Sequence, residues 1–185
     1  MPADGEHTIL FDARAIARAL QRMTLEIVAL AQGTDHLVLV GIRRRGVELA
    51  ERIGALIRED LRVDIPRGAL DITLYRDDLQ TVGPRPVIGE TRLPHEIEGK
   101  VVVIVDDVLY TGRTVRAALD ELTDFGRPAR IGLCVLVDRG GRELPIQADV
   151  VGAYLDVAPG DQVEVRLEEV DGRDVVELVK GGDST

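Results

Sequence analysis

Apolar residues recur along this chain at spacings that predict three helices. Over residues 13–32 they fall at three- and four-residue steps, at Ile16, Leu20, Met23, Ile27 and Leu30. That spacing places them on one face of an α-helix, and Asp12 just ahead of them is a suitable N-cap. The same spacing returns over residues 47–59 and 114–125, so we predict helices there as well.

Shorter apolar runs predict the strands of a sheet. Residues 101–105 are consecutive β-branched side chains, as expected of a central parallel strand. We predict further strands over residues 37–40, 69–75, 131–137, 150–155, 162–167 and 174–179. A turn at Asp171 and Gly172 is expected between the last two. Because strands alternate with helices, the sequence predicts an α/β fold with a mainly parallel central sheet flanked by helices.

Residues 76–98 break this regular pattern. The segment combines charges, three prolines and two glycines with no sustained apolar period. A loop of this length inside a compact domain is usually functional or disordered. We therefore predict a single domain over residues 1–185, in which 76–98 form a mobile active-site loop and 181–185 a disordered tail.

Composition narrows the class of protein. The 185 residues are 45% apolar and 3% aromatic, which suits one aliphatic core. The net charge of −10 argues against attraction of the whole molecule to polyanions, although it leaves room for a local basic patch. The lone Cys134 can form neither an intramolecular disulfide nor a zinc site. No apolar run is long enough to span a membrane and the first residues do not resemble a signal peptide, so we expect a cytoplasmic protein.

The most informative segment is VVVIVDDVLYTGRT, at residues 101–114. A buried strand leads into two carboxylates, Asp106 and Asp107. A short turn then leads into a helix and carries Thr111, Gly112, Arg113 and Thr114. Ligands of open α/β sheets bind at the carboxyl ends of strands, and a helix N-terminus attracts phosphate.

The two halves of this segment suit different parts of one ligand. Hydroxyl groups and a glycine complete a phosphate cradle, whereas the carboxylates would repel phosphate and suit hydroxyl donors or a divalent cation. A vicinal diol on a ribose 5-phosphate satisfies both halves. Two solvated aspartates followed by an ordinary helix cap are the alternative.

The segment resembles the phosphoribosyl-pyrophosphate motif of the type I phosphoribosyltransferases. The resemblance implies that Asp106 and Asp107 contact the ribose 2- and 3-hydroxyl groups and that residues 111–114 hold the 5-phosphate. Val108, Leu109 and Tyr110 would line the nucleotide, with plain packing an equal alternative for Tyr110. It also implies the fold of that family, in which a small hood lies over the strand ends.

Two further stretches are similar to the PyrR family. They are DITLYRDDL at residues 71–79 and LVDRGGRELPI at residues 136–146, and the resemblance covers most of the chain. PyrR proteins bind the leader mRNA of pyrimidine operons in a uridine-nucleotide-dependent way and promote transcription attenuation. They also convert uracil and phosphoribosyl pyrophosphate (PRPP) to UMP and diphosphate. The resemblance implies both functions here, with UMP or UTP as the effector.

The resemblance also indicates the groups that would receive the diphosphate. LVGIRRRGVELA, at residues 39–50, is similar to the pyrophosphate loop, so the candidates are Arg43, Arg44 and above all Arg45. A solvated run of arginines is the alternative, and the family usually has threonine at the position of Arg44. Arg76 is a further catalytic candidate, with a surface arginine as its alternative. Mg²⁺ would arrive with PRPP, and Asp106 and Asp107 are its candidate ligands.

Uracil is expected beside Val137, Asp138 and Arg139, where relatives read the base mainly with backbone groups. The chemistry of these side chains alone does not indicate a base site. A purine-specific enzyme would be expected to lack the DRG-x-RELPI pattern, so we expect activity with uracil and not with hypoxanthine.

For RNA, the resemblance points to the first helix and to the segment around RELPI. Arg14, Arg18 and Arg22 fall at four-residue steps along one helical stripe, and Arg142 would extend it. A solvated amphipathic helix is the alternative.

Three positions depart from the family on this face. Gly141 replaces a usual histidine, Gln147 a usual basic residue and Leu25 a common histidine. Each change removes a donor or a charge that would meet phosphate. The alternative function is therefore a uracil phosphoribosyltransferase whose RNA binding is weakened or lost.

A nucleotide sensor without activity is the third hypothesis. The intact diphosphate loop argues against it, because a sensor of UMP needs no diphosphate cradle. Since relatives form dimers and often tetramers, we expect a homodimer or homotetramer.

Overall fold

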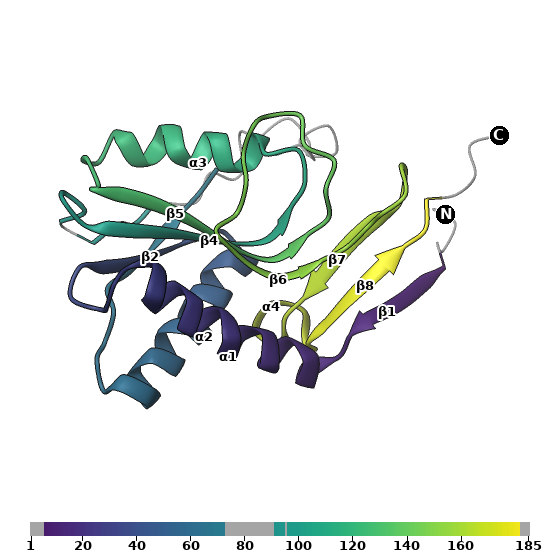
Figure 1. Ribbon diagram of the computed structural model, residues 1–185. Coiled ribbons are helices and arrows are strands. Elements are labelled where there is room, and N and C mark those ends of the chain that lie inside the picture. Colours follow the sequence, from purple (N-terminus) through teal and green to yellow (C-terminus); the bar gives the residue numbers. More distant parts are fainter. Residues whose placement is uncertain (1–5, 73–90, 95, 182–185) are drawn as a thin grey trace.

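The computed structural model describes residues 6–72, 91–94 and 96–181, and Figure 1 shows their arrangement. Strands and helices alternate from β1 to β3 and again from β4 to β5. The elements are β1 (His7–Phe11), α1 (Ala13–Leu30), β2 (Leu37–Ile42), α2 (Arg45–Leu61), β3 (Arg67–Leu70), β4 (Val101–Leu109), α3 (Arg113–Thr123), β5 (Arg130–Asp138), β6 (Val150–Tyr154), β7 (Gln162–Arg166), α4 (Glu168–Asp171) and β8 (Val175–Val179). The helices begin within two residues of the predicted positions, and Asp12 caps α1 by accepting from the Ala15 amide at 2.8 Å.

A five-stranded sheet in the order β3-β2-β4-β5-β6 forms the centre of the molecule, and its neighbouring strands are all parallel. Helices α1 and α2 cover one face and α3 covers the other (Figure 1). Successive strand residues point to opposite faces, so Leu39 and Val103 pack beneath α1 and α2 while Val40 and Ile104 pack beneath α3. The predicted fold class is confirmed.

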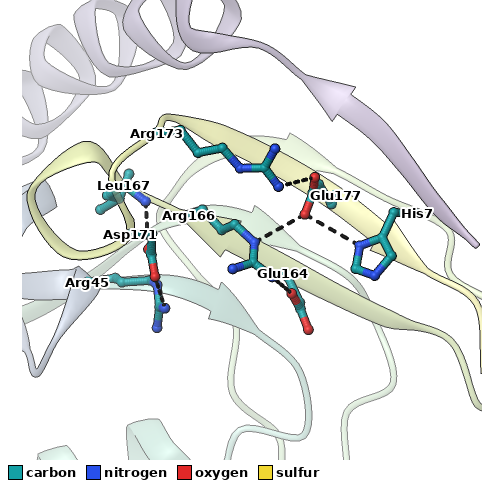
Figure 2. Close-up of polar contacts among 8 residues, drawn as sticks. All are labelled: His7, Arg45, Glu164, Arg166, Leu167, Asp171, Arg173 and Glu177. Carbon is teal, nitrogen blue, oxygen red and sulfur yellow. Dashed lines mark hydrogen bonds and ion pairs between the residues drawn. The ribbon is translucent and has the colours of Figure 1, made fainter. Parts of the chain in front are cut away.

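A second, three-stranded antiparallel sheet, in the order β1-β8-β7, stands beside the central one. Glu177 of β8 is only 3% exposed, although it carries a carboxylate. Figure 2 shows its partners: Arg173 and Arg166 donate to it at 2.8 and 3.2 Å, and the His7 ring nitrogen lies 3.6 Å away. A buried carboxylate must be paired, and these partners meet that need. Because His7 lies in β1, Arg166 in β7 and Glu177 in β8, the contacts also join all three strands of the small sheet. The lead-in at His7–Phe11 is thus a strand, which the sequence analysis did not predict.

The connection between β7 and β8 is longer than the expected turn at Asp171 and Gly172. The one-turn helix α4 connects β7 to β8, and Gly172 ends it in the left-handed region with a φ of 79°. A charged Leu-Glu-Glu-Val-Asp segment has no apolar period by which so short a helix could be recognised.

Two strands differ from their predicted bounds by more than two residues. β3 covers Arg67–Leu70, earlier than residues 69–75, because its parallel partner β2 ends at Ile42; residues 73–75 lie outside the described part. β4 continues past residue 105 to Leu109, because β5 pairs with it as far as Asp138.

Most of the predicted loop at 76–98, and residues 182–185 of the predicted tail, lie outside the described residues. Residues 91 and 92, which follow the undescribed part of this loop, are bonded to β3, to the residue after it and to α3. Arg92 bridges to Ala69 of β3, and the Thr91 hydroxyl accepts from the Asp71 amide at 3.1 Å and donates to Glu121 of α3 at 2.5 Å. Among the described helices, none is long and apolar enough to cross a membrane.

Candidate active site

Asp106 and Asp107 lie side by side in the second half of β4, which is the central strand of the sheet. Asp106 is 3% exposed, and its Oδ1 accepts from the Asp107 amide at 2.9 Å. Asp107 is half-buried, and its Oδ1 accepts from the Val108 amide at 2.9 Å. Since neighbouring strand residues face opposite sides, the two carboxylates offer oxygens on both faces of the strand end.

The turn after β4 delivers the start of α3 to the same strand end. Gly112 is the N-cap residue, with a φ of 92°, and no side chain caps the helix. The Thr111 hydroxyl is nearly buried and accepts from the Arg113 amide at 3.2 Å. The first amides of a helix lack partners within it, so Gly112 and Thr114 present N–H groups at the positive dipole end, beside the hydroxyl of Thr114.

The RELPI segment braces this turn from outside. The Thr111 carbonyl accepts from the amides of Glu143 and Leu144 at 2.9 and 3.1 Å. Arg113 points its side chain away, to Glu143 at 2.7 Å, and its amide is bonded to the Thr111 hydroxyl. The sequence analysis quoted RELPI as a signature without recognising this bracing role.

Arg142, which we predicted to extend the RNA face, is the centre of this brace. Its guanidinium donates to the Ile146 carbonyl and the Tyr110 carbonyl, both at 2.8 Å, and to Asp138 at 2.5 Å. The side chain therefore joins the phosphate turn to the end of β5. An arginine with three internal acceptors is a structural element of the site.

The predicted pyrophosphate loop lies directly beside β4. β2 ends at Ile42, the Arg43–Arg44 peptide is cis, and α2 begins at Arg45. Gly46 then passes so close to β4 that an added Cβ would lie 2.4 Å from the Val105 carbonyl oxygen and 3.2 Å from the Asp106 Cα. Only glycine fits this approach, which brings residues 43–46 against the carboxylate pair.

Arg45 itself is held by a residue from the far end of the chain. Its Nε and Nη2 groups donate to Oδ2 and Oδ1 of Asp171 at 3.1 and 2.8 Å, and Asp171 also accepts from the Leu167 amide at 2.8 Å (Figure 2). These hydrogen bonds raise the pKa of Arg45 against the opposing effect of burial, and the charge of Asp107 adds to the rise. The same bonds lower the pKa of Asp171.

Of the other arginine candidates, Arg43 is partly buried and Arg44 exposed, and Arg76 lies outside the described residues.

The predicted base-binding segment borders an open cavity of about 670 Å³. Its walls are residues 138–142 at the end of β5 and residues 154–157 after β6. Asp138 accepts from the Gly140 amide at 3.0 Å as well as from Arg142, which fixes the shape of this wall. Val137 is fully buried between β4 and β6, so its side chain is not available to a ligand.

Tyr110 and Arg139 stack on one another at the mouth of this cavity. The guanidinium carbon lies 3.9 Å from the ring centroid, and the Arg139 Nη1 donates to the Asp161 carbonyl at 3.0 Å. A Cβ on Gly141 would approach the Tyr110 ring to 2.5 Å. The ring therefore occupies space that the usual histidine at position 141 would need.

The three arginines of the predicted RNA-binding stripe on α1 differ in whether they contact other parts of the protein. Arg22 bonds to Glu26 at 2.8 Å and to the carbonyls of Val151 and Gly152 at 3.2 and 2.5 Å, where β6 is the edge strand of the sheet. Arg14 and Arg18 are exposed, with no hydrogen bond or ion pair to the part of the chain that the structure describes. Leu25, one of the departures from the family, is 68% exposed on the same helix.

The carboxylate pair fits a metal ion only in combination with other ligands. Across the described residues, no group of three or more His, Cys, Asp or Glu side chains could hold a metal. Carboxylate oxygens are the ligands that Mg²⁺ prefers, but its six positions need more than Asp106 and Asp107. The arrangement suits an ion that shares its remaining positions with substrate oxygens and water.

Known proteins resemble this chain in sequence over most of its length. Residues 7–170 match the model of the phosphoribosyl transferase domain. Over 169 residues the chain is 56% identical to the "Bifunctional protein PyrR" of Thermus aquaticus, covering 91% of this chain and 93% of that protein. The protein of the same name from Roseiflexus sp. is 58% identical over 168 residues, with 91% of each chain covered. This chain belongs to the PyrR family of phosphoribosyltransferases. The sequence-based predictions of the family, of its bifunctional type and of a phosphoribosyltransferase enzyme are therefore confirmed.

Solved structures support the fold alone. The hypoxanthine phosphoribosyltransferase of Trypanosoma cruzi superposes with a TM-score of 0.70 at 20% identity, covering 94% of this chain and 97% of that one. A hypoxanthine-guanine phosphoribosyltransferase from Bacillus anthracis gives a TM-score of 0.67 at 19% identity, with 93% and 97% covered. Both share the type I phosphoribosyltransferase architecture with this PyrR family member.

Proposed function

We propose that the chain transfers a phosphoribosyl group from PRPP to uracil at the strand ends of β2, β4 and β5. The observation that carries the proposal is the convergence of three features at one edge of the sheet. These are the Asp106–Asp107 pair, the uncapped start of α3, and the loop at residues 43–46 that Gly46 allows to lie against β4. Each suits a different part of PRPP: the ribose diol, the 5-phosphate and the diphosphate.

The residues of this site divide the work of the reaction. Asp106 and Asp107 would accept hydrogen bonds from the ribose hydroxyls and favour the positive charge that develops on the ribose ring. The amides of Gly112 and Thr114 and the Thr114 hydroxyl would hold the 5-phosphate in place. Arg43, Arg44 and Arg45 would stabilise the diphosphate as it leaves with increasing negative charge. The part played by Arg76 stays a prediction.

Mg²⁺ fits this scheme as an ion brought by the substrate. When bound, it would neutralise the charge that develops on the diphosphate as it leaves. Asp106 and Asp107 are the residues that would hold it, directly or through water, because they supply the hard oxygen ligands nearest to the proposed ribose site.

Uracil would be read by the backbone at residues 137–139. Val137 is buried and the Asp138 side chain is already committed to Arg142. The Asp138 carbonyl and the Arg139 amide are also bonded, to the Leu155 amide at 2.9 Å and the Leu109 carbonyl at 3.1 Å, so the pyrimidine edge would meet the other peptide groups of this segment. The stacked Tyr110 and Arg139 would bound the base on its open side. A substrate assay with uracil and with hypoxanthine would distinguish a pyrimidine-specific from a purine-specific enzyme.

The 5-phosphate assignment can be tested with two threonines of one helix. Thr114→Val removes the hydroxyl at the start of α3, and Thr123→Val removes the hydroxyl that donates to the Asp120 carbonyl at its end. Titration with UMP is expected to give a dissociation constant roughly tenfold higher for Thr114→Val, the worth of one hydrogen bond to a charged group. Uridine, which lacks the phosphate, should bind both variants equally. Equal UMP affinity in the two variants would contradict the assignment.

We propose that leader RNA meets the exposed part of α1. Arg14 and Arg18 are free to contact phosphate, whereas Arg22 and Arg142 hold the protein together. Filter binding to the leader of the pyrimidine genes, with and without UMP, is the test. Arg18→Ala should weaken RNA binding without altering thermal stability, whereas Arg22→Ala should lower the unfolding temperature. Binding no tighter than to a scrambled hairpin would leave the uracil phosphoribosyltransferase alone.

The remaining expectations follow from the same proposal. A protein that meets PRPP, uracil and mRNA would work in the cytoplasm. The homodimer or homotetramer expected from the family stays a prediction, and light scattering of the purified protein would decide it.

A further inference from the structure

Two ion-pair clamps join helix α2 to the connection between β7 and β8. The first is Arg45 on Asp171, and the second is Arg52 on Asp174 and Glu169. Arg52 donates to Asp174 at 2.9 and 2.7 Å and to Glu169 at 2.8 and 2.6 Å. Both clamps therefore fasten the small sheet to the same helix, two turns apart.

The two aspartates are closely matched as chemical groups. Each accepts two hydrogen bonds from one guanidinium, and each also accepts a backbone amide, Leu167 on Asp171 and Glu168 on Asp174, both at 2.8 Å. Their side chains are 11% and 16% exposed. They differ in their distance from the site, because Arg45 opens α2 whereas Arg52 lies further along it. They also differ in that Arg52 has Glu169 as a second carboxylate partner.

Arg45 sits at the junction between the diphosphate loop and the carboxylate pair. It follows Arg43 and Arg44 directly, and the next residue, Gly46, touches β4 at Val105. The pairing with Asp171 uses Nε and Nη2 and leaves Nη1 without an acceptor in the described part of the chain. Figure 2 shows Asp171 fixed in turn by the Leu167 amide, so the guanidinium is held from the side of α4.

We propose that Asp171 is a positioning residue for the diphosphate of PRPP, acting through Arg45. It would hold the guanidinium in one rotamer and fix the first turn of α2, so that the loop at residues 43–45 is ordered before the substrate arrives. Pre-ordering a long cationic side chain lowers the entropy lost on binding an anion. This inference rests on the proposed PRPP site and adds to it a residue that is remote in sequence and does not touch the substrate.

The test compares Asp171→Asn with Asp174→Asn. Each variant removes one carboxylate from one clamp and leaves the side-chain size unchanged. The unfolding temperature should fall by a few degrees at most in both, and by less in Asp174→Asn, because Glu169 still pairs with Arg52. Steady-state kinetics of UMP formation should show a KM for PRPP roughly tenfold higher in Asp171→Asn, the scale of one charge-assisted hydrogen bond. The KM for uracil should stay within twofold, and Asp174→Asn should match the unsubstituted enzyme in both constants.

A double-variant cycle shows whether Asp171 acts through Arg45. In an Arg45→Lys background the lysine cannot make the two-pronged contact, so adding Asp171→Asn should raise the KM for PRPP by less than twofold further. Equal PRPP constants in Asp171→Asn and Asp174→Asn, at comparable stability, would overturn the inference. A protein that makes no UMP before any substitution would overturn the proposed function instead.

Discussion

Adjacent aspartates in this site occupy different surroundings, and the difference decides what each can do. Asp106 is nearly buried, whereas Asp107 is half-buried and acts electrostatically on Arg45 of the diphosphate loop. The more accessible carboxylate is the better candidate for direct contact with the ribose hydroxyls. The pattern of two carboxylates could be recognised from the sequence, but this division between them could not, because burial depends on α2 and α3 packing around β4.

Replacement of Asp107 tests that contact. Asp107→Asn keeps the shape of the side chain and removes the charge, so kcat/KM for UMP formation should fall about 100-fold, the usual loss of one group that stabilises transition-state charge. Asp120→Asn on the exposed side of α3 makes the same change of charge away from the site and should leave the rate unaltered. Near-normal turnover by Asp107→Asn would refute the ribose role.

Cys134 is a residue whose behaviour follows from burial alone. It lies in β5 with no exposed surface, and burial raises the pKa of its thiol. Because the thiolate is the reactive form, a small thiol reagent should modify the native protein far more slowly than the urea-unfolded chain. Stoichiometric labelling of the native protein within minutes would show that β5 opens more readily than the structure implies.

At the scale of elements, the clamps between α2 and the β7–β8 connection depend on ionised carboxylates. Hydrogen bonds from Arg45 and Arg52 lower the pKa values of Asp171, Asp174 and Glu169. When the pKa of a carboxyl is lower in the folded state than in the unfolded state, its ionised form stabilises the fold. The contribution is complete above the unfolded-state pKa, about 4 for such groups, and is lost as the pH falls through the folded-state pKa.

Acid should therefore weaken these clamps below about pH 4. Urea unfolding at pH 7 and pH 3 should show a smaller loss of stability for the Asp171→Asn/Asp174→Asn double variant than for the unsubstituted protein. The variant has two fewer carboxylates that must be protonated on unfolding in acid. Equal losses in the two proteins would show that other carboxylates dominate the acid transition.

The elements also show where sequence patterns reach their limit. Helices α1, α2 and α3 are predicted well because their buried residues recur at helical steps. The end of β4 is not, since Asp106 and Asp107 interrupt its apolar run although pairing with β5 continues to Leu109. Helix α4 is missed because it is one turn long and highly charged.

Over the whole molecule, the sequence predicts the fold and the phosphate turn but not the contacts between distant segments. The turn is encoded in fourteen consecutive residues and can be recognised by itself. Arg45 and Asp171 are 126 positions apart, and nothing local to either residue indicates that they meet. The inward role of Arg142 is likewise invisible until the Tyr110 carbonyl and Asp138 are brought together by the turn and β5.

The effect of charge on RNA binding also depends on contacts that the sequence alone does not show. The net charge of −10 says little about RNA, because screening over about 8 Å at physiological salt separates one face from another. What matters is which cations on α1 are free, and the structure assigns Arg22 to the edge of β6 and leaves Arg14 and Arg18 exposed.

The most direct test of this account is an assay of the purified chain with PRPP, Mg²⁺ and either uracil or hypoxanthine. We predict that UMP forms with uracil, that no IMP forms with hypoxanthine, and that UMP formation requires Mg²⁺. Absence of UMP under these conditions, or formation of IMP in its place, would contradict the assignment of the strand ends of β2, β4 and β5 as a uracil phosphoribosyltransferase site.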